Sequence, residues 1–187
     1  YLPAEQVRAD VTVIADGSRG TLSTEFRELF GGGPNPQVYS VGIKTVFQFE
    51  GKSPFGADRA VHTLGYPAAA DVFGGGFVYS MGESLTAAGV ILGLDWPYAN
   101  LNPYEAFEAY RAHPLIAKWL KGGKPVATGA RTIPEGGFYS LSRLSAPGVL
   151  VAGDGAGFVN MRKIKGMHYA IQTGGAAGET AAEAVLA

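Results

Sequence analysis

The stretch from residue 147 to residue 160 constrains the fold of this chain more than any other. After a Pro-Gly turn, the apolar run Val149–Ala152 is bounded by glycines, which is typical of a short, buried parallel strand. A glycine-rich turn begins at Gly153, and residues 163–173 are expected to form a helix. A strand, a glycine turn and a helix in this order indicate a βα corner of the kind that holds nucleotides.

A carboxylate, Asp154, stands at the tip of this strand. The free N–H groups at the start of a helix favour an anionic or electron-rich ligand. Asp154 is well placed to accept hydrogen bonds from ribityl or ribose hydroxyls. An ordinary βα turn with a capping aspartate accounts for the same residues, so both interpretations stay open.

A second strand–turn–helix lies near the start of the chain. Residues 10–15 are typical of a buried strand, and 21–30 of an amphipathic helix. The pair Asp16-Gly17 occupies the turn between them, much as Gly153-Asp154 does in the other unit. Two such corners predict a parallel sheet whose strand tips line one ligand. Ser18 is interpreted either as the N-cap of the helix or as part of that site.

The run Gly31–Pro36 marks a domain boundary, because glycine and proline interrupt regular structure. The residues beyond it predict an antiparallel sheet and two short helices. Asn102 should cap the first helix, with Pro103 in its first turn, and His113-Pro114 should start the second. The strands expected in this part of the chain are 38–49, 60–65, 74–81, 84–95 and 126–133.

The predicted fold class is therefore mixed α/β and α+β. Residues 1–36 and 137–187 should form two parts of one parallel-sheet domain. Residues 37–136 should form an antiparallel domain inserted between those two parts.

Composition argues against several classes of function. Net charge is −1, from 15 basic and 16 acidic residues, and no basic block suggests nucleic-acid binding. The chain has no cysteine, which excludes disulfides, thiolate catalysis and cysteine-ligated metals within it. Its three histidines lack ligand spacing, and no acid/base pair stands out. We therefore assign no catalytic residue and no metal site. No apolar run reaches the roughly 20 residues needed to span a bilayer.

The chain is better suited to holding a flat redox cofactor than to hydrolysis. The run Gly74–Gly76 has two interpretations. It is either a bulge or tight turn leading into a strand, or a bare backbone that a flat ligand approaches. In the second interpretation, Phe73, Phe77 and Tyr79 supply an apolar wall.

Short blocks along nearly the whole chain follow a recognisable order. The blocks are Val61–Pro67, Phe73–Tyr79, Gly93–Asp95, Asn102-Pro103, His113-Pro114, Gly122–Lys124, Gly129–Arg131, Glu135–Gly137 and Lys163–His168.

In this order the blocks resemble the electron transfer flavoprotein–ubiquinone oxidoreductase family. The resemblance implies a membrane-peripheral, FAD-dependent dehydrogenase that passes electrons from reduced electron transfer flavoprotein to ubiquinone. It implies a glutathione-reductase-like FAD-binding sheet with an inserted quinone-binding domain. It assigns FAD contacts to Asp16, Gly17, Gly153, Asp154, Gly157, Phe158 and Val159, and quinone contacts to Phe73, Gly74 and Gly75.

A basic cluster follows the second corner. Arg162, Lys163 and Lys165 are interpreted either as solvated charge or as cations that favour the reduced, anionic flavin.

The chain departs from the family pattern in two respects. It has no Gly-x-Gly-x-x-Gly corner for the ADP half of FAD, and no cysteines for the family's [4Fe–4S] cluster. We therefore expect an internal fragment, or a truncated paralogue, of a protein that binds FAD when complete. This chain should be soluble and inactive alone. The complete protein should lie on the mitochondrial inner or bacterial cytoplasmic membrane, which it contacts through parts outside this chain.

Two further functions remain open from sequence. The same FAD motifs serve geranylgeranyl reductases and flavin hydroxylases, in which the inserted domain would hold an isoprenoid or aromatic substrate. A non-catalytic quinone- or lipid-binding module is the third interpretation.

Overall fold

The computed structural model describes residues 7–160 and 165–186. These residues divide into two compact units. Unit 2 is Tyr39–Ile133, and unit 1 comprises the described residues on either side of it. The boundaries between the units lie after Val38 and after Ile133. The boundaries expected from the sequence lie after residues 36 and 136.

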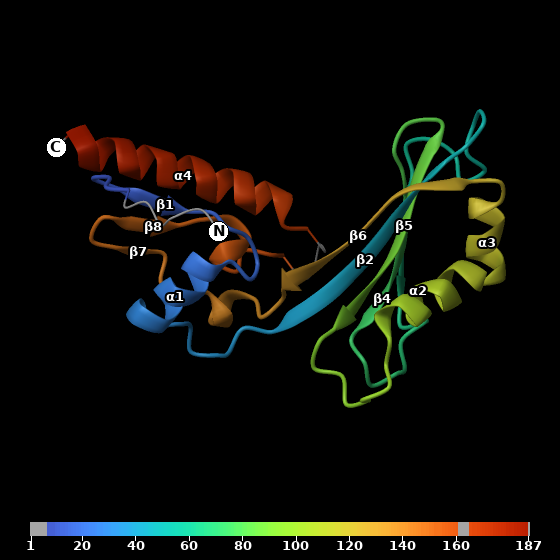
Figure 1. Cartoon of the computed structure of the whole chain (residues 1–187), viewed down its shortest axis with the longest axis horizontal. Coiled ribbons are helices and arrows are strands. Elements are labelled where there is room, and N and C mark those ends of the chain that lie inside the picture. Colours follow the sequence, from blue (N-terminus) through green and yellow to red (C-terminus); the bar gives the residue numbers. More distant parts are fainter. Residues whose placement is uncertain (1–6, 161–164, 187) are drawn as a thin grey trace. The chain divides into compact units, whose positions relative to one another are not determined.

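The helices and strands follow one another in a fixed order, and most of them are labelled in Figure 1. They are β1 (Thr12–Ile14), α1 (Thr21–Phe30), β2 (Tyr39–Gln48), β3 (Ala60–Leu64), β4 (Gly74–Ser80), β5 (Leu85–Gly93), α2 (Pro103–Ala112), α3 (Pro114–Leu120), β6 (Lys124–Pro134), η1 (Phe138–Ser140), β7 (Ser145–Ala146), β8 (Val149–Val151), η2 (Gly153–Gly155) and α4 (Met167–Leu186), where η denotes a 3₁₀ turn.

Unit 1 is built on a three-stranded sheet in the order β1-β8-β7. Strands β1 and β8 are parallel, with Ile14 opposite Val151, as the two predicted corners require. The two-residue strand β7 was not predicted, and it pairs antiparallel with β8, so the sheet is mixed. The strands run between α4 and α1 in Figure 1. The buried core of unit 1 consists of Ile14, Phe26, Val151 and Ala156.

The helix of the second corner begins later than predicted. It starts at Met167 rather than Lys163, and it continues to Leu186. Asn160 and Lys165 form an antiparallel bridge, so Lys165 does not belong to the helix. The predicted basic cluster falls largely on Arg162 and Lys163, which lie outside the described residues.

Unit 2 contains a five-stranded sheet in the order β3-β4-β5-β2-β6. The β2–β5, β4–β5 and β3–β4 pairs are antiparallel, as predicted. Helices α2 and α3 lie on one face of this sheet (Figure 1). The core between helices and sheet is Ile43, Phe47, Phe49, Phe55, Val78, Ala88, Val90, Phe107, Tyr110, Ile116 and Leu120.

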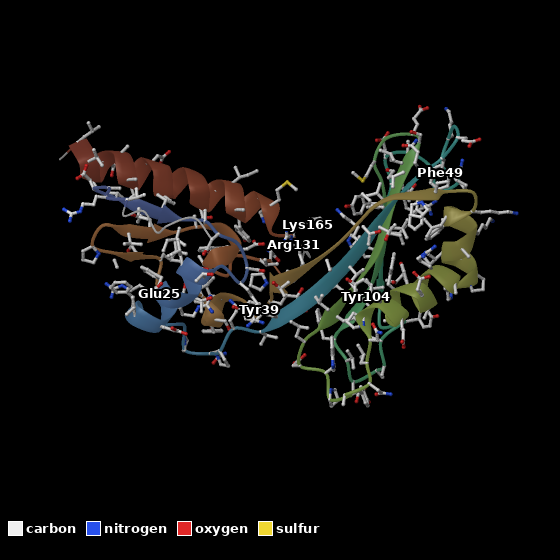
Figure 2. All side chains as sticks on the ribbon, viewed as in Figure 1. Glu25, Tyr39, Phe49, Tyr104, Arg131 and Lys165 are labelled. Atoms are coloured by element: carbon white, nitrogen blue, oxygen red, sulfur yellow. The ribbon has the colours of Figure 1, made fainter. Side chains whose placement is uncertain are left out.

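Both helices of unit 2 start where the sequence predicted. The Asn102 side chain accepts a hydrogen bond from the Tyr104 N–H at 3.0 Å, and Pro103 fills the first turn. His113 caps α3 in the same way, because its Nδ1 accepts from the Leu115 N–H at 3.3 Å. In Figure 2, Tyr104 lies near the start of α2, and Phe49 near the opposite end of the sheet.

Candidate functional site

The parallel pairing of β1 and β8 brings the two predicted corners of unit 1 together. Both strands end at the same edge of the sheet. The turn after β1, which contains Asp16-Gly17, therefore lies beside η2, which follows β8. A Cβ built on Gly155 would lie 3.3 Å from an Asp16 carboxylate oxygen and 3.5 Å from the Gly17 carbonyl oxygen. The two turns are therefore in direct contact.

The Asp16 carboxylate caps α1. Its Oδ2 accepts hydrogen bonds from the Leu22 N–H at 2.9 Å and the Ser23 N–H at 3.2 Å. Gly20 occupies the N-cap position, so of the two interpretations of Ser18 the one that makes it the N-cap is wrong. A Cβ on Gly20 would overlap the Asp16 carboxylate. Asp16 thus has a structural role at the helix start, in addition to any contact with a ligand.

Gly153 and Asp154 form the tip of the second corner. Gly153 has φ +64°, in the left-handed region that favours glycine, and its N–H donates to Thr173 Oγ1 of α4 at 2.9 Å. Burial raises the pKa of the Asp154 carboxyl above its ordinary value. A Cβ on Gly166 would lie 3.2 Å from that carboxyl, so the chain entering α4 covers one side of it.

A cavity of about 350 Å³ lies beside this corner. The predicted flavin contacts Gly157, Phe158 and Val159 line it, whereas Asp16 and Asp154 do not. Sequence reasoning assigned none of the other lining residues to the site, although Gly137 belongs to the Glu135–Gly137 block. The remaining lining residues are Gly137, Phe138, Leu141, Asn160 and Tyr169.

The cavity fits a flat aromatic group. Its side chains are mainly apolar or aromatic, and the Phe158 and Tyr169 ring centroids are 6.3 Å apart. Gly157 has φ +92°, and a Cβ there would lie 2.5 Å from Gln37 Nε2. The loop therefore favours glycine at residue 157, mainly because of this positive φ. A ring system with apolar faces and polar edges suits such a lining.

The predicted quinone contacts lie in unit 2, where β4 begins. Phe73 is 52% exposed. Gly74 and Gly75 pair regularly with Leu92 and Ile91 of β5, so the run is not a bulge or a tight turn.

The three glycines of β4 fit their places because neighbouring groups leave no room for a side chain. A Cβ on Gly74 would lie 2.5 Å from the Ile91 carbonyl oxygen. A Cβ on Gly75 would overlap the Thr63 carbonyl oxygen, and one on Gly76 would overlap the Tyr110 ring. Close packing within the sheet accounts for the missing side chains, whether or not a ligand also lies there.

Two absences follow from the structure of the described residues. No group of three or more His, Asp or Glu side chains is arranged there to hold a metal ion. Within the same residues, no helix is long and apolar enough to cross a membrane.

Comparison with known proteins identifies the family. Residues 39–133, which are unit 2, match the family model described as "ETF-QO, ubiquinone-binding". The chain belongs to the electron transfer flavoprotein–ubiquinone oxidoreductase family. This confirms the resemblance found in the sequence, and the family is one of FAD-dependent oxidoreductases.

The relatives are much longer than this chain. A probable mitochondrial electron transfer flavoprotein–ubiquinone oxidoreductase from Saccharomyces cerevisiae is 39% identical over 176 residues, covering 93% of this chain and 28% of that protein. The human mitochondrial electron transfer flavoprotein–ubiquinone oxidoreductase is 38% identical over 179 residues, covering 94% of this chain and 29% of that protein. The chain thus spans less than a third of these relatives.

Solved structures support the fold class. A geranylgeranyl bacteriochlorophyll reductase-like protein from Thermoplasma acidophilum matches with a TM-score of 0.69 and 21% identity, over 95% of this chain and 42% of that one. A flavoprotein/dehydrogenase from Cytophaga hutchinsonii matches with a TM-score of 0.58 and 19% identity, over 88% of this chain and 39% of that one. At such low identity the likeness concerns the fold alone, and it confirms the predicted mixed architecture.

Proposed function

We propose that this chain forms part of a flavoprotein oxidoreductase that passes electrons from reduced electron transfer flavoprotein, through FAD, to ubiquinone. The observation that carries the proposal is the match of unit 2 to a ubiquinone-binding domain. The glycine corner and aromatic cavity of unit 1 support the flavin half of the proposal.

In this proposal, unit 1 holds the isoalloxazine. When bound, FAD supplies a ring that accepts and releases electrons. Gly157, Phe158 and Val159 would contact that ring, and Phe138 and Tyr169 would exclude water from it. Asp154 would accept a hydrogen bond from a ribityl hydroxyl, and Asp16 would hold the start of α1 beside the same corner.

Unit 2 would bind the electron acceptor. Phe73 presents an exposed ring at the start of β4, and Gly74 and Gly75 follow it without side chains. An aromatic ring next to side-chain-free backbone suits the flat, apolar headgroup of a quinone.

The remaining parts of the proposal concern the complete protein. Electron transfer flavoprotein would be its electron donor, and ubiquinone its acceptor. Because this chain has no cysteine, the ligands of a [4Fe–4S] cluster would come from outside it. We place the complete protein peripherally on the mitochondrial inner or bacterial cytoplasmic membrane.

The full-length protein that contains this chain provides the test. Its absorption spectrum should contain flavin bands, and it should reduce a short-chain ubiquinone analogue when supplied with reduced electron transfer flavoprotein. Asp154→Ala should lower its flavin content after gel filtration. A full-length protein that binds flavin but leaves the quinone oxidised would contradict the proposal.

A further inference from the structure

The sheet of unit 2 has a second face, opposite α2 and α3, which we call the distal face. Side chains alternate between the two faces of a strand. Ile43 of β2 and Val78 of β4 pack in the helix-covered core, so their neighbours Lys44, Phe77 and Tyr79 lie on the distal face. Gly75, a predicted quinone contact, lies on that face by the same alternation.

Lys44 lies on this face beside two aromatic side chains, Phe77 and Tyr79. Lys44 is half-buried, and its Nζ donates a hydrogen bond to the Tyr79 hydroxyl at 3.1 Å. The same ammonium lies 5.8 Å from the centroid of the Tyr79 ring. The Phe77 ring stacks beside Tyr79, with centroids 5.7 Å apart. The cation is thus held against an aromatic surface.

No carboxylate balances this charge within the described part of the chain. The ion pairs there join Lys52 to Glu83, Arg111 to Glu108 and Lys124 to Glu50. A half-buried ammonium has three N–H donors, and the hydroxyl of Tyr79 takes one of them. Such a group favours an electron-rich oxygen from a ligand.

Neighbouring side chains cover the glycine backbone around Lys44. Gly89 lies opposite both Lys44 and Phe77 in the paired strands. A Cβ on Gly89 would overlap the Phe77 ring, so this ring covers the glycine. A Cβ on Gly42, two residues before Lys44 on the same strand, would lie 3.3 Å from Ile133 Cδ1, so a side chain covers this glycine too. A flat ring would therefore lie against the half-buried Phe77 and Tyr79 rings beside the ammonium, rather than on bare backbone.

We propose that Lys44 donates a hydrogen bond to a carbonyl oxygen of the quinone headgroup, on the distal face of unit 2. The inference rests on the proposed function and names a binding residue for it. All the residues that carry it lie within the matched ubiquinone-binding domain.

The chemistry of the acceptor explains why a cation is useful there. Reduction of a quinone to its quinol takes two electrons, which the reduced flavin supplies, and two protons, which water supplies. Before protonation, negative charge builds on a quinone oxygen. An ammonium within hydrogen-bond distance stabilises that charge more than it stabilises the neutral quinone.

Tyr79 acts here as a positioning residue. Its hydroxyl accepts from Lys44 Nζ, and this bond restrains a side chain that otherwise has many rotamers. Its ring contributes to the aromatic surface that Phe77 extends.

The test uses the full-length protein and a short-chain ubiquinone analogue. Lys44→Met should lower kcat/KM for the analogue about 10- to 100-fold and weaken its direct binding, since a charge-assisted hydrogen bond is lost. Lys44→Arg keeps the charge and should stay within about threefold of wild type. Tyr79→Phe should lower kcat/KM about threefold, mainly through KM. Lys52→Met is the matched control, because that lysine is exposed on the same unit.

Three outcomes overturn the inference. Unchanged analogue binding and kcat/KM in Lys44→Met would show that the ammonium does not contact the quinone. Loss of flavin with normal analogue binding would place Lys44 at the cofactor instead. If Lys44→Met misfolds, wild-type-like binding by Lys44→Gln, which removes the charge, decides against it. A wild-type protein that binds flavin but reduces no quinone would overturn the proposed function itself.

Discussion

The two units use glycine for different physical reasons. In unit 1, Gly153 and Gly157 have positive φ, so the turn needs their backbone freedom. In unit 2, Gly74 and Gly75 are regular strand residues, and neighbouring strands occupy the space of a side chain. Glycine therefore shapes a turn beside the cavity in one unit and permits close packing in the other. The same residue type in a sequence can thus indicate either a ligand corner or a tightly packed sheet.

The largest expected effect is at Gly75. A Cβ there would overlap the backbone of β3, which cannot move without disturbing the sheet. Gly75→Ala should lower the free energy of unfolding of unit 2 by about 2–3 kcal/mol. Both tryptophans of the chain, Trp96 and Trp119, lie in unit 2, so their fluorescence during urea unfolding measures this loss.

Gly129→Ala is the matched control for Gly75→Ala. Gly129 is also a strand residue, in β6, but a Cβ there meets nothing within 4 Å. This variant should be neutral or more stable by about 0.5–1 kcal/mol, because alanine loses less backbone entropy than glycine in a strand. Equal losses in both variants would contradict a packing role for Gly75. The packing also means that a large substitution at Gly75 would not test quinone binding cleanly.

A smaller effect is expected at Gly153. A Cβ there would make only an ordinary contact with Ala170, at 3.6 Å, so the cost is mainly the left-handed backbone. Gly153→Ala should destabilise unit 1 by about 1–2 kcal/mol. Circular dichroism, to which the helix of α4 contributes, should detect this loss in a urea titration.

Gly153→Asn separates the two explanations at this position. Asparagine tolerates positive φ better than alanine although it is larger. A smaller loss for asparagine than for alanine supports backbone strain as the cause. The reverse order would point to a shortage of space, and Gly153 would then resemble the strand glycines of unit 2.

Much of the fold could be predicted because it depends on local pattern. Alternation predicted the antiparallel strands of unit 2, and Asn102-Pro103 predicted the start of α2. The apolar runs at Thr12–Ile14 and Val149–Val151 predicted two strands that are parallel neighbours. In each case the pattern that predicts one element lies within a few consecutive residues.

The errors concern contacts between residues that are distant in sequence, or elements too short to have a pattern. Strand β7 has two residues, so no periodicity can indicate it. The Asp16 carboxylate caps α1 from a position six residues before the Leu22 N–H, outside the usual capping spacing. The crowding of Gly75 by Thr63 depends on strand pairing. The cavity residues Phe138 and Tyr169 likewise come from separate elements.

The smallest expected effect concerns charge at the unit 1 corner. Burial raises the pKa of Asp154 in the folded state, so the folded protein keeps this proton to higher pH than the unfolded chain does. Stability should therefore fall as pH rises from the ordinary aspartate pKa through the raised one. Asp154→Asn removes this titration. The free energy of unfolding of the variant, compared with that of the wild type, should therefore be higher at neutral pH than at acid pH. Urea titrations of both proteins across that range measure the difference. If the stability of the two proteins changed with pH in the same way, the Asp154 carboxylate would lose no hydration on folding. The corner would then be as open to water as an exposed turn.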